Sequence, residues 1–388
     1  MYYRDFANAW RGKTLRITAI AGSVYFQDCE ATGHSMDQPN SIYLDRDGLG
    51  LSAAEVTAQL ARLTAGQDPL PDVYGLGGTV EDVENFFAQQ LGKERALFMP
   101  TGTLANQLAI RALAGERRRV IVQDVSHVYN DTGDACQTLS ALTLLPLAPG
   151  RATFSWREVE EAVQRTESGR VAAPIGALSI ESPVRRLSGE LFDRVQMIDI
   201  CEGARRLGIG LHLDGARLYI ASAYSGISPA EYARPFDTVY VSLWKYFNSL
   251  NGAILAGPRE ILNGMVATRR MFGGALFQAW PFALLARHYA SSYLDHMKSA
   301  IAVSEGFISG INGTSARVER IVNGTNIFRL VVAREQGEVL RIRLARQGVF
   351  LSRPFQRNGE AVFSLLVNES WNRTTGAQLT SRFRAALG

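Results

Sequence analysis

The sequence has little cysteine and no long apolar run, and each absence excludes a class of protein. Cys29, Cys136 and Cys201 are too few and too far apart for a disulfide framework or a zinc site, so we expect no metal. No apolar run approaches the ~20 residues that a helix needs to span a bilayer. Residues 17–26 follow two basic residues but are short and lack a convincing cleavage site, which argues against a signal peptide. We therefore expect a cytoplasmic protein that does not bind membranes.

Neither sign of charge dominates the chain. The 41 lysines and arginines nearly balance the 37 acidic residues, giving a net charge of +4, and the basic residues are scattered. This pattern does not predict a nucleic-acid partner. The contents of 46% hydrophobic and 20% charged residues are ordinary for a globular protein and exclude a disordered chain.

Several common catalytic and nucleotide-binding motifs are also missing. The chain contains neither a GxxxxGK[ST] phosphate loop nor a GxSxG nucleophile motif. Gly75-Leu76-Gly77 lacks the third glycine of a dinucleotide-binding motif and follows no strand. His212 and Asp214 fall on the same side of one strand, but such a pair more often forms a structural hydrogen bond than a metal site.

What the sequence does contain is a regular alternation of short apolar strands and helices. This alternation predicts a mostly parallel sheet with helices on both faces. The predicted strands are residues 96–99, 120–122, 142–147, 177–180, 211–213, 238–243 and 253–256. The predicted helices are residues 55–63, a helix capped by Thr79, and residues 101–113 and 191–207.

The pattern changes beyond about residue 285. A long helix over 284–311, strands over 318–322 and 327–332, and a helix over 337–347 predict a smaller α+β domain. We therefore divide the chain into an irregular N-terminal arm (1–50), a large domain (51–285) and a small C-terminal domain (286–388). The predicted fold class is α/β, with a small α+β domain appended.

Three features of the large domain point to one kind of chemistry. The turn at residues 100–106 opens a helix whose free N–H groups favour a phosphate, although for this turn alone an ordinary helix cap is the favoured explanation. Asp214 ends a predicted strand, where α/β sheets bind ligands, and Arg217 is near enough to pair with it. Lys245 follows an apolar strand among aromatic residues, which would lower its pKa and make it a nucleophile.

A phosphate site, a strand-end Asp and a strand-end Lys follow one another in the order required to hold pyridoxal 5'-phosphate (PLP). At this point the chain resembles the threonine aldolase and aromatic amino acid β-eliminating lyase family of fold type I PLP enzymes. The resemblance covers roughly residues 70–285. The motifs that carry it are Asp72-Val73-Tyr74-Gly75, Thr79-Val80, Pro100-Thr101-Gly102-Thr103, Ala105-Asn106, His127 with Tyr129, Leu213-Asp214-Gly215-Ala216-Arg217, Lys245, and Arg269 with Gly273-Gly274.

The resemblance implies a role for each matching residue. Lys245 would form the Schiff base with the cofactor, Asp214 would pair with its ring nitrogen, and His127 would stack on its ring. Gly102 and Thr103 would hold its phosphate. Arg217 would face the lysine and the carboxylate of a small amino-acid substrate. The resemblance also implies a homodimer or homotetramer whose active sites are shared between subunits.

The chain departs from the family pattern where the substrate binds. The histidine that assists aldol cleavage is replaced by Val184, and the N-terminal Arg-Ser-Asp-Thr motif by residues 45–48. The carboxylate-binding arginine near the C-terminus has no counterpart in residues 362–365. Arg185, Arg186, Arg353 and Arg357 are the candidates to replace it. Trp244, Tyr246, Phe247 and Phe277 either shape an apolar pocket or pack in the core, and we favour packing.

These departures leave more than one function open. We expect a PLP-dependent lyase that cleaves a Cα–Cβ bond or eliminates a β-substituent, and not an efficient threonine aldolase. A transaminase or racemase on the same fold is the second interpretation, because the choice of bond depends on an angle that the sequence does not specify. A cofactor-binding protein without catalysis is the third.

Overall fold

The computed structural model describes residues 40–66 and 68–388, and its centre is a seven-stranded sheet of order β2-β8-β7-β6-β5-β3-β4. The strands are β2 (Arg95–Met99), β3 (Arg119–Gln123), β4 (Thr143–Leu147), β5 (Ile175–Glu181), β6 (Gly210–Asp214), β7 (Thr238–Ser242) and β8 (Ala253–Gly257). Strands β7, β6, β5, β3 and β4 run parallel, and β8 is antiparallel to both of its neighbours. The predicted mostly parallel sheet is confirmed.

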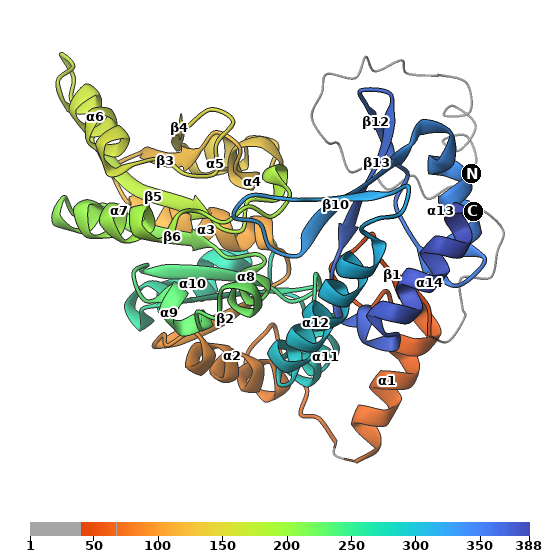
Figure 1. Ribbon diagram of the computed structural model, residues 1–388. Helices are drawn as coiled ribbons and strands as arrows, with labels where there is room; N and C mark the ends of the chain where they lie inside the picture. Colours follow the sequence, from red (N-terminus) through yellow and green to blue (C-terminus); the bar gives the residue numbers. More distant parts are fainter. Residues whose placement is uncertain (1–39, 67) are drawn as a thin grey trace, which may run out of the picture. The chain divides into compact units, whose positions relative to one another are not determined.

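Helices cover both faces of this sheet (Figure 1). They are α2 (Gly78–Gln90), α3 (Gly102–Ala114), α4 (His127–Asn130), α5 (Ala135–Ser140), α6 (Trp156–Glu167), α7 (Arg194–Arg206), α8 (Leu218–Ser225), α9 (Pro229–Ala233) and α10 (Arg259–Met271). Successive strand residues point to opposite faces. Leu97 and Met99 therefore pack with α3 and α10, whereas Phe98 packs with α2 in the main core.

A second, four-stranded antiparallel sheet has the order β12-β13-β10-β9. Its strands are β9 (Arg317–Arg320), β10 (Ile327–Ala333), β12 (Phe355–Arg357) and β13 (Glu360–Leu366). The C-terminal helices are α11 (Trp280–Ala290), α12 (Tyr293–Ile311), α13 (Gly337–Ala345) and α14 (Gly376–Leu387). The predicted large α/β part with a smaller α+β part is thus confirmed as a fold class.

Two helix predictions were wrong. Thr79 does not cap α2, because its hydroxyl donates to the carbonyl of Leu70 and the N-cap position is Gly77. The long helix predicted over 284–311 is interrupted at Ser291 and Ser292, which separate α11 from α12. The apolar spacing continues from α11 into α12 as in a single helix, and the chain turns at the two serines between them.

The predicted domain boundaries remain predictions, and residues 1–39 of the predicted arm lie outside the described residues. In the described remainder, β1 (Ile42–Tyr43) pairs in parallel with β11 (Val349–Phe350), and α1 (Ala53–Ala65) begins at a capping box on Ser52. The N-terminal strand therefore packs with the C-terminal part of the chain.

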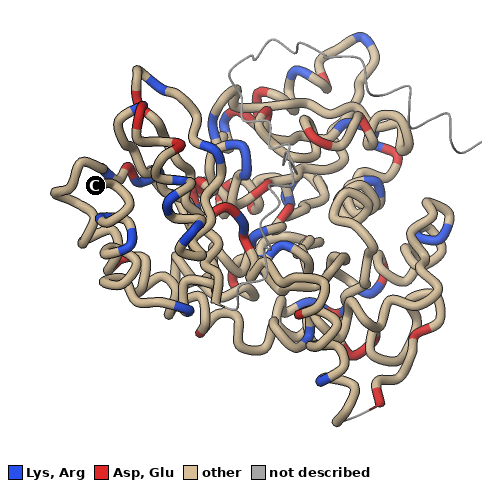
Figure 2. The backbone as a smooth tube through the Cα atoms, turned by 90° about the vertical axis from the view of Figure 1, so that its right-hand side faces the viewer, with Lys and Arg blue, Asp and Glu red and all other residues tan. Residues whose placement is uncertain are grey.

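Basic and acidic residues are interspersed along the chain in Figure 2. None of the helices in the described ranges is long and apolar enough to cross a membrane. Of the cysteines, Cys136 and Cys201 are buried and free, and Cys29 is outside the described ranges.

Candidate active site

The carboxyl ends of three neighbouring strands bring charged side chains together. Glu181 ends β5 and Asp214 ends β6, and the two residues are direct partners in the parallel register. Lys245 follows β7, the next strand of the sheet. This is the edge at which parallel α/β sheets bind ligands. The structure therefore brings Asp214 and Lys245 to one place, as the sequence predicted, and adds Glu181, which the sequence analysis missed.

Asp214 is buried and held by a chain of hydrogen bonds. Asn106 Nδ2 donates to one carboxylate oxygen at 2.6 Å, and the backbone N–H of Ala216 donates to the other at 3.2 Å. The Asn106 amide oxygen is 2.9 Å from His212 Nε2, and His212 Nδ1 is 2.8 Å from the Thr238 hydroxyl. Complete burial lowers the pKa of His212 to about 4, despite the opposing charge of Asp214. His212 is therefore neutral, and it orients the amide that orients Asp214.

Lys245 is one of four lysines in the chain, with Lys13, Lys93 and Lys298. Its Nζ forms no hydrogen bond or ion pair with any residue in the described ranges, and it lies 5.6 Å from the centre of the Trp244 ring. Burial and the nearby charge of Arg217 lower the pKa of Lys245 to about 8, while Asp214 and Asp47 oppose the shift. Near neutral pH this amine is thus unprotonated more often than an ordinary lysine, and the unprotonated form is the nucleophile.

Arg217 pairs with Asp47, not with Asp214 as the sequence suggested. Its Nε and Nη2 lie 2.9 and 2.8 Å from one carboxylate oxygen of Asp47. The other oxygen accepts Asn326 Nδ2 at 3.3 Å. Burial alone would lower the pKa of Arg217, but the Asp47 charge raises it above its ordinary value. The sequence suggested Asp214 as the partner of Arg217 because it lies only three residues before it. The observed partner, Asp47, is 170 residues away.

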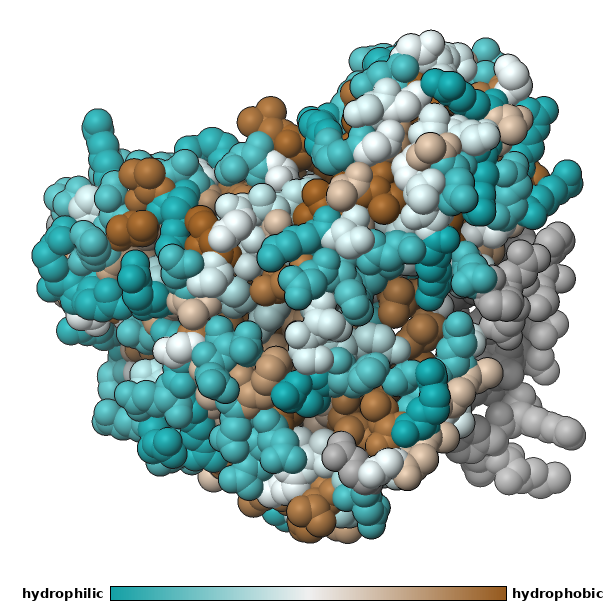
Figure 3. Space-filling model, turned by 60° about the horizontal axis from the view of Figure 1, so that its bottom comes forward, coloured by the Kyte–Doolittle hydropathy of each residue, from teal (hydrophilic) through white to brown (hydrophobic). Residues whose placement is uncertain are grey.

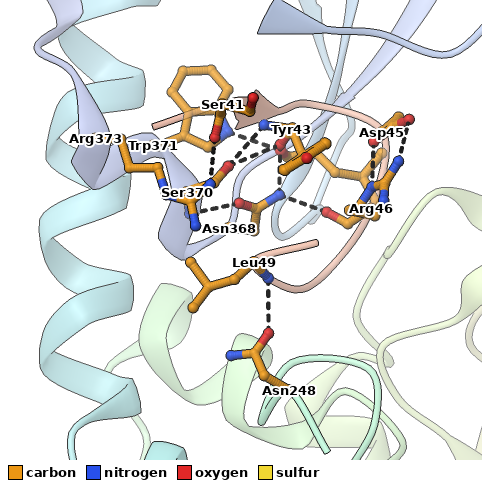
Figure 4. A network of polar contacts seen from close by, with 11 residues as sticks. Ser41, Tyr43, Asp45, Arg46, Leu49, Asn248, Asn368, Ser370, Trp371 and Arg373 are labelled. Carbon is orange, nitrogen blue, oxygen red and sulfur yellow. Dashed lines mark hydrogen bonds and ion pairs between the residues drawn. The ribbon is translucent and has the colours of Figure 1, made fainter. Parts of the chain in front are cut away.

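The segment that carries Asp47 is fixed by buried polar contacts from the C-terminal part of the chain (Figure 4). Asn368 Nδ2 donates to the carbonyl oxygens of Tyr43 and Arg46 at 2.7 and 2.6 Å. The Ser370 hydroxyl oxygen accepts the N–H of Tyr43 at 3.0 Å, and Asn248 accepts the N–H of Leu49 at 2.8 Å. Asn248 lies three residues after Lys245, so this network also ties the lysine turn to the N-terminal segment.

The predicted phosphate site lies at the start of α3. Thr101 caps this helix by accepting the N–H of Leu104 at 3.2 Å, which leaves the N–H groups of Gly102 and Thr103 without a partner in the described ranges. A Cβ at Gly102 would collide with the ring and hydroxyl of Tyr240 on β7. Glycine is therefore required here, and two free N–H groups at a helix start form an anion-binding site.

His127 begins α4 beside Glu181. Its backbone N–H donates to Glu181 Oε2 at 2.6 Å, and its Nδ1 is buried without a hydrogen-bond partner. Burial lowers the pKa of His127, and Lys245 and Arg185 add to this effect while Asp214 and Asp131 oppose it. Burial and the charge of Asp214 raise the pKa of Glu181 to about 7. Glu181 could have been found from the sequence, because it ends a predicted strand as Asp214 does.

The loop of the predicted Asp72-Val73-Tyr74-Gly75 motif is fixed from both sides. Asp72 accepts the N–H groups of Gly75, Ala279 and Trp280 at 2.8, 2.7 and 2.8 Å. The buried Arg269 donates to the carbonyl oxygen of Tyr74 at 3.0 Å. The motif residues therefore have a structural role in this loop, and Val73 and its neighbour Leu76 remain exposed.

The unusual aromatic residues divide into two pairs. Tyr246 and Phe247 are fully buried, in agreement with the packing that we favoured. Trp244 and Phe277 are 51% and 61% exposed, so they are not core residues, although the Phe277 ring contacts the Tyr74 ring. Val184 and Phe363, which stand where the family pattern has a histidine and an arginine region, are fully buried and offer no polar group.

The fold, together with the charged residues at the strand ends, places the protein in the class of fold type I PLP enzymes. A putative L-allo-threonine aldolase from Listeria monocytogenes superposes with a TM-score of 0.75 and 27% identity, covering 88% of this chain and 94% of that one. A serine palmitoyltransferase from S. paucimobilis, solved with bound PLP and myriocin, superposes with a TM-score of 0.63 over 89% of this chain and 87% of that one. Its 15% identity shows the fold alone.

The sequence comparisons narrow the class to a family. The family model described as beta-eliminating lyase matches residues 47–331, and the chain belongs to this family. A low-specificity L-threonine aldolase from Candida albicans is 29% identical over 62% of this chain and 63% of its own length. The chain spans between 54% and 64% of the length of the first four curated relatives that it matches.

Proposed function

We propose that the protein is a PLP-dependent lyase that acts on an amino acid, by Cα–Cβ cleavage of a β-hydroxy amino acid or by β-elimination. The observation that carries the proposal is the juxtaposition of Lys245 with Asp214 at neighbouring strand ends. The names of the relatives, threonine aldolases among them, support the reaction class. Lys245, Asp214, His127, Arg217, Gly102 and Thr103 are the residues to which we assign the site.

The residues at this site fit the cofactor in charge and hydrogen bonding. Gly102 packs directly against Tyr240, where a side chain would collide, and the two free N–H groups of Gly102 and Thr103 suit a phosphate. Asp214 offers a buried carboxylate to a protonated ring nitrogen, and His127 has a buried nitrogen without a partner. Lys245 has an amine without an ion-pair partner in the described ranges. The bound cofactor supplies an electron sink for a carbanion at the substrate's Cα.

The side chains then divide the remaining work. Lys245 would hold the cofactor, and its free amine would accept or donate a proton; a pKa of about 8 suits both directions near neutral pH. Asp214 stabilises positive charge on the ring nitrogen, and the chain through Asn106 to His212 keeps its carboxylate in place. Arg217 presents a cation whose position is fixed by Asp47.

The site supports threonine poorly. Retro-aldol cleavage needs a base on the substrate hydroxyl, and the position of the family's histidine holds the fully buried, apolar Val184. Loss of a general base costs about 10²- to 10⁴-fold in rate. We therefore expect threonine cleavage to be weak and a β-substituted amino acid, whose elimination needs no base on a hydroxyl, to be preferred.

The experiment is a panel of amino acids offered to the holoprotein, with identification of the carbonyl product. L-Threonine and L-allo-threonine are compared with phenylserine and β-chloroalanine by kcat/KM. A keto acid from β-chloroalanine, at higher kcat/KM than for threonine, is the expected result. Transamination or racemisation without bond cleavage would replace the lyase by the second interpretation, and efficient threonine cleavage would refute the argument from Val184.

We also infer that the protein forms a homo-oligomer. Leu70, Val73, Leu76, Met271 and Phe277 belong to the loop of residues 70–78 and to the segment 271–277, and each is more than half exposed. The two segments are in contact, because Tyr74 N–H donates to the carbonyl of Phe277 at 2.9 Å. Figure 3 shows hydrophobic side chains interrupting the hydrophilic surface of the face that it displays. Light scattering tests this: a monomer would contradict it, and a dimer or tetramer agrees.

A further inference from the structure

Two arginines share one carboxylate next to the proposed site. Arg185 Nη2 and Arg186 Nη2 each lie 2.6 Å from an oxygen of Asp131. Burial alone would raise the pKa of Asp131, but the hydrogen bonds from Arg186 and Arg185 hold it below its ordinary range. Asp131 is therefore ionised, and the cluster of two cations and one anion carries a net charge of +1. Such a cluster attracts a further anion.

Arg185 differs from Arg186 in one respect that points to a ligand. Arg185 Nε is buried and has no hydrogen-bond partner, whereas Arg186 Nε contacts Asp131 at 3.4 Å. A buried N–H of a charged group that lacks an acceptor is costly, so such groups almost always have a partner. The Nε–H of Arg185 can therefore donate to an acceptor that the described residues do not supply.

Arg185 is also tied to the catalytic edge of the sheet. Its backbone N–H donates to Glu181 Oε1 at 2.8 Å, and the other oxygen of Glu181 accepts the N–H of His127 at 2.6 Å. The charges of Arg185 and Lys245 both act on the His127 ring. Glu181 therefore fixes Arg185 and His127 side by side at the strand end that neighbours Asp214.

The other arginines that could bind an anion are already engaged, and Arg353 also has an interaction within the structure. Arg357 donates to both carboxylate oxygens of Glu319 at 2.6 and 2.7 Å, on the small sheet. Arg217 is paired with Asp47, and Arg269 donates to the carbonyls of Phe98 and Tyr74. The Nε of Arg269 is also buried without a hydrogen-bond partner, but the nearby charges of Glu84 and Asp72 compensate this cation. Neither Arg357 nor Arg217 has such a donor.

We propose that Arg185 binds the α-carboxylate of the amino-acid substrate through its Nε–H. Asp131 holds the guanidinium in position, and Glu181 holds the backbone N–H of the same residue. The inference rests on the proposed function, and it makes Arg185 a specificity-determining residue for free amino acids over uncharged derivatives. Arg186, which contacts the same Asp131, has no part in substrate binding.

The test compares Arg185→Gln with Arg186→Gln, because each removes one cation from Asp131 at the same distance. The first measurement is KM for phenylserine and for its amide, which lacks the carboxylate charge. Loss of a hydrogen bond to a charged group weakens binding about 10- to 100-fold. We expect Arg185→Gln to lose about this much of the wild-type preference for the acid over the amide, while Arg186→Gln keeps it within about 3-fold. Equal losses in both variants, or none in Arg185→Gln, would overturn the proposal.

The second measurement does not depend on turnover. Calorimetry with hydrocinnamate, a carboxylate without an amino group, gives a Kd that we expect to rise in Arg185→Gln and not in Arg186→Gln. If Arg185→Gln does not fold, Arg185→Lys keeps the charge but lacks Nε–H, and we expect it to show the same loss in part. Arg185-dependent hydrocinnamate binding without turnover of any amino acid would refute the proposed function alone. Turnover with equal constants in both variants would refute the role of Arg185 alone.

Discussion

The buried pair of Arg217 and Asp47 gives the sharpest stability prediction, through the variant Asp47→Asn. The two side chains are 13% and 7% exposed, and one carboxylate oxygen accepts both Nε and Nη2 at 2.9 and 2.8 Å. The variant keeps the shape of the side chain and removes its charge. Arg217 is then left as a buried cation without a counter-charge.

The expected loss follows from this geometry. Removing one partner of a buried ion pair destabilises a protein by about 3–5 kcal/mol, since the remaining charge is uncompensated. Asparagine retains one acceptor oxygen, so we expect a value near the lower limit of about 3 kcal/mol. With a urea m-value of roughly 3 kcal/mol/M, the unfolding midpoint falls by about 1 M. Urea unfolding followed by tryptophan fluorescence measures this shift.

A neighbouring ion pair provides the control. Asp45 and Arg46 lie in the same segment at the same distance of 2.8 Å, but they are 19% and 32% exposed. Asp45→Asn is therefore expected to cost less than about 1 kcal/mol. The double variant Asp47→Asn/Arg217→Gln leaves no unpaired charge, so its loss falls short of the sum of the single losses by about 1–3 kcal/mol. If Asp47→Asn costs no more than Asp45→Asn, the buried pair does not have the importance that we assign to it.

Two further predictions concern Glu181 and Gly102. Burial and the Asp214 charge raise the pKa of Glu181 from 4.5 to about 7, so the folded protein binds this proton more tightly than the unfolded chain, and stability falls as pH rises through this window. Glu181→Gln should flatten the dependence of the thermal midpoint on pH between about 4.5 and 7; an unchanged slope would refute the raised pKa. Gly102→Ala should destabilise the fold by about 1–3 kcal/mol and weaken cofactor binding, because the new Cβ collides with Tyr240. Gly264→Ala, in the middle of α10 with no atom within 4 Å of the new Cβ, should instead stabilise by about 0.5–1 kcal/mol, and similar behaviour of the two variants would contradict the prediction.

The fold could be predicted from the sequence where local patterns determine it. The strand over 120–122 is buried on both faces, and its run of Val120, Ile121 and Val122 shows this directly. The break between α11 and α12 could not be predicted, since the apolar spacing continues across Ser291. The antiparallel direction of β8 and the pairing of β1 with β11 depend on contacts between distant segments, which no local pattern records.

The candidate site could be predicted in part for the same reason. Asp214 and Lys245 follow strands, and the topology rule brings strand ends together. Asp47 could not be predicted in this way, because its contact with Arg217 depends on how the N-terminal segment is held. Asn368 holds this segment by hydrogen bonds to Tyr43 and Arg46, and Asn368 lies more than 300 residues from both in the chain. The role of Glu181 also depends on two backbone N–H groups that only the folded loops present to it.

The most direct test of the account is the identification of the lysine that holds the cofactor. The protein is incubated with PLP, reduced with borohydride and mapped by peptide mass spectrometry, and only four lysines can be labelled. Lys93 is the instructive competitor, because burial lowers its pKa as well, but its amine donates to the carbonyl of Phe236 at 2.5 Å. The account predicts one label, on Lys245, and none in Lys245→Ala. A label on Lys13, Lys93 or Lys298 in place of Lys245, or no label at all, would contradict it.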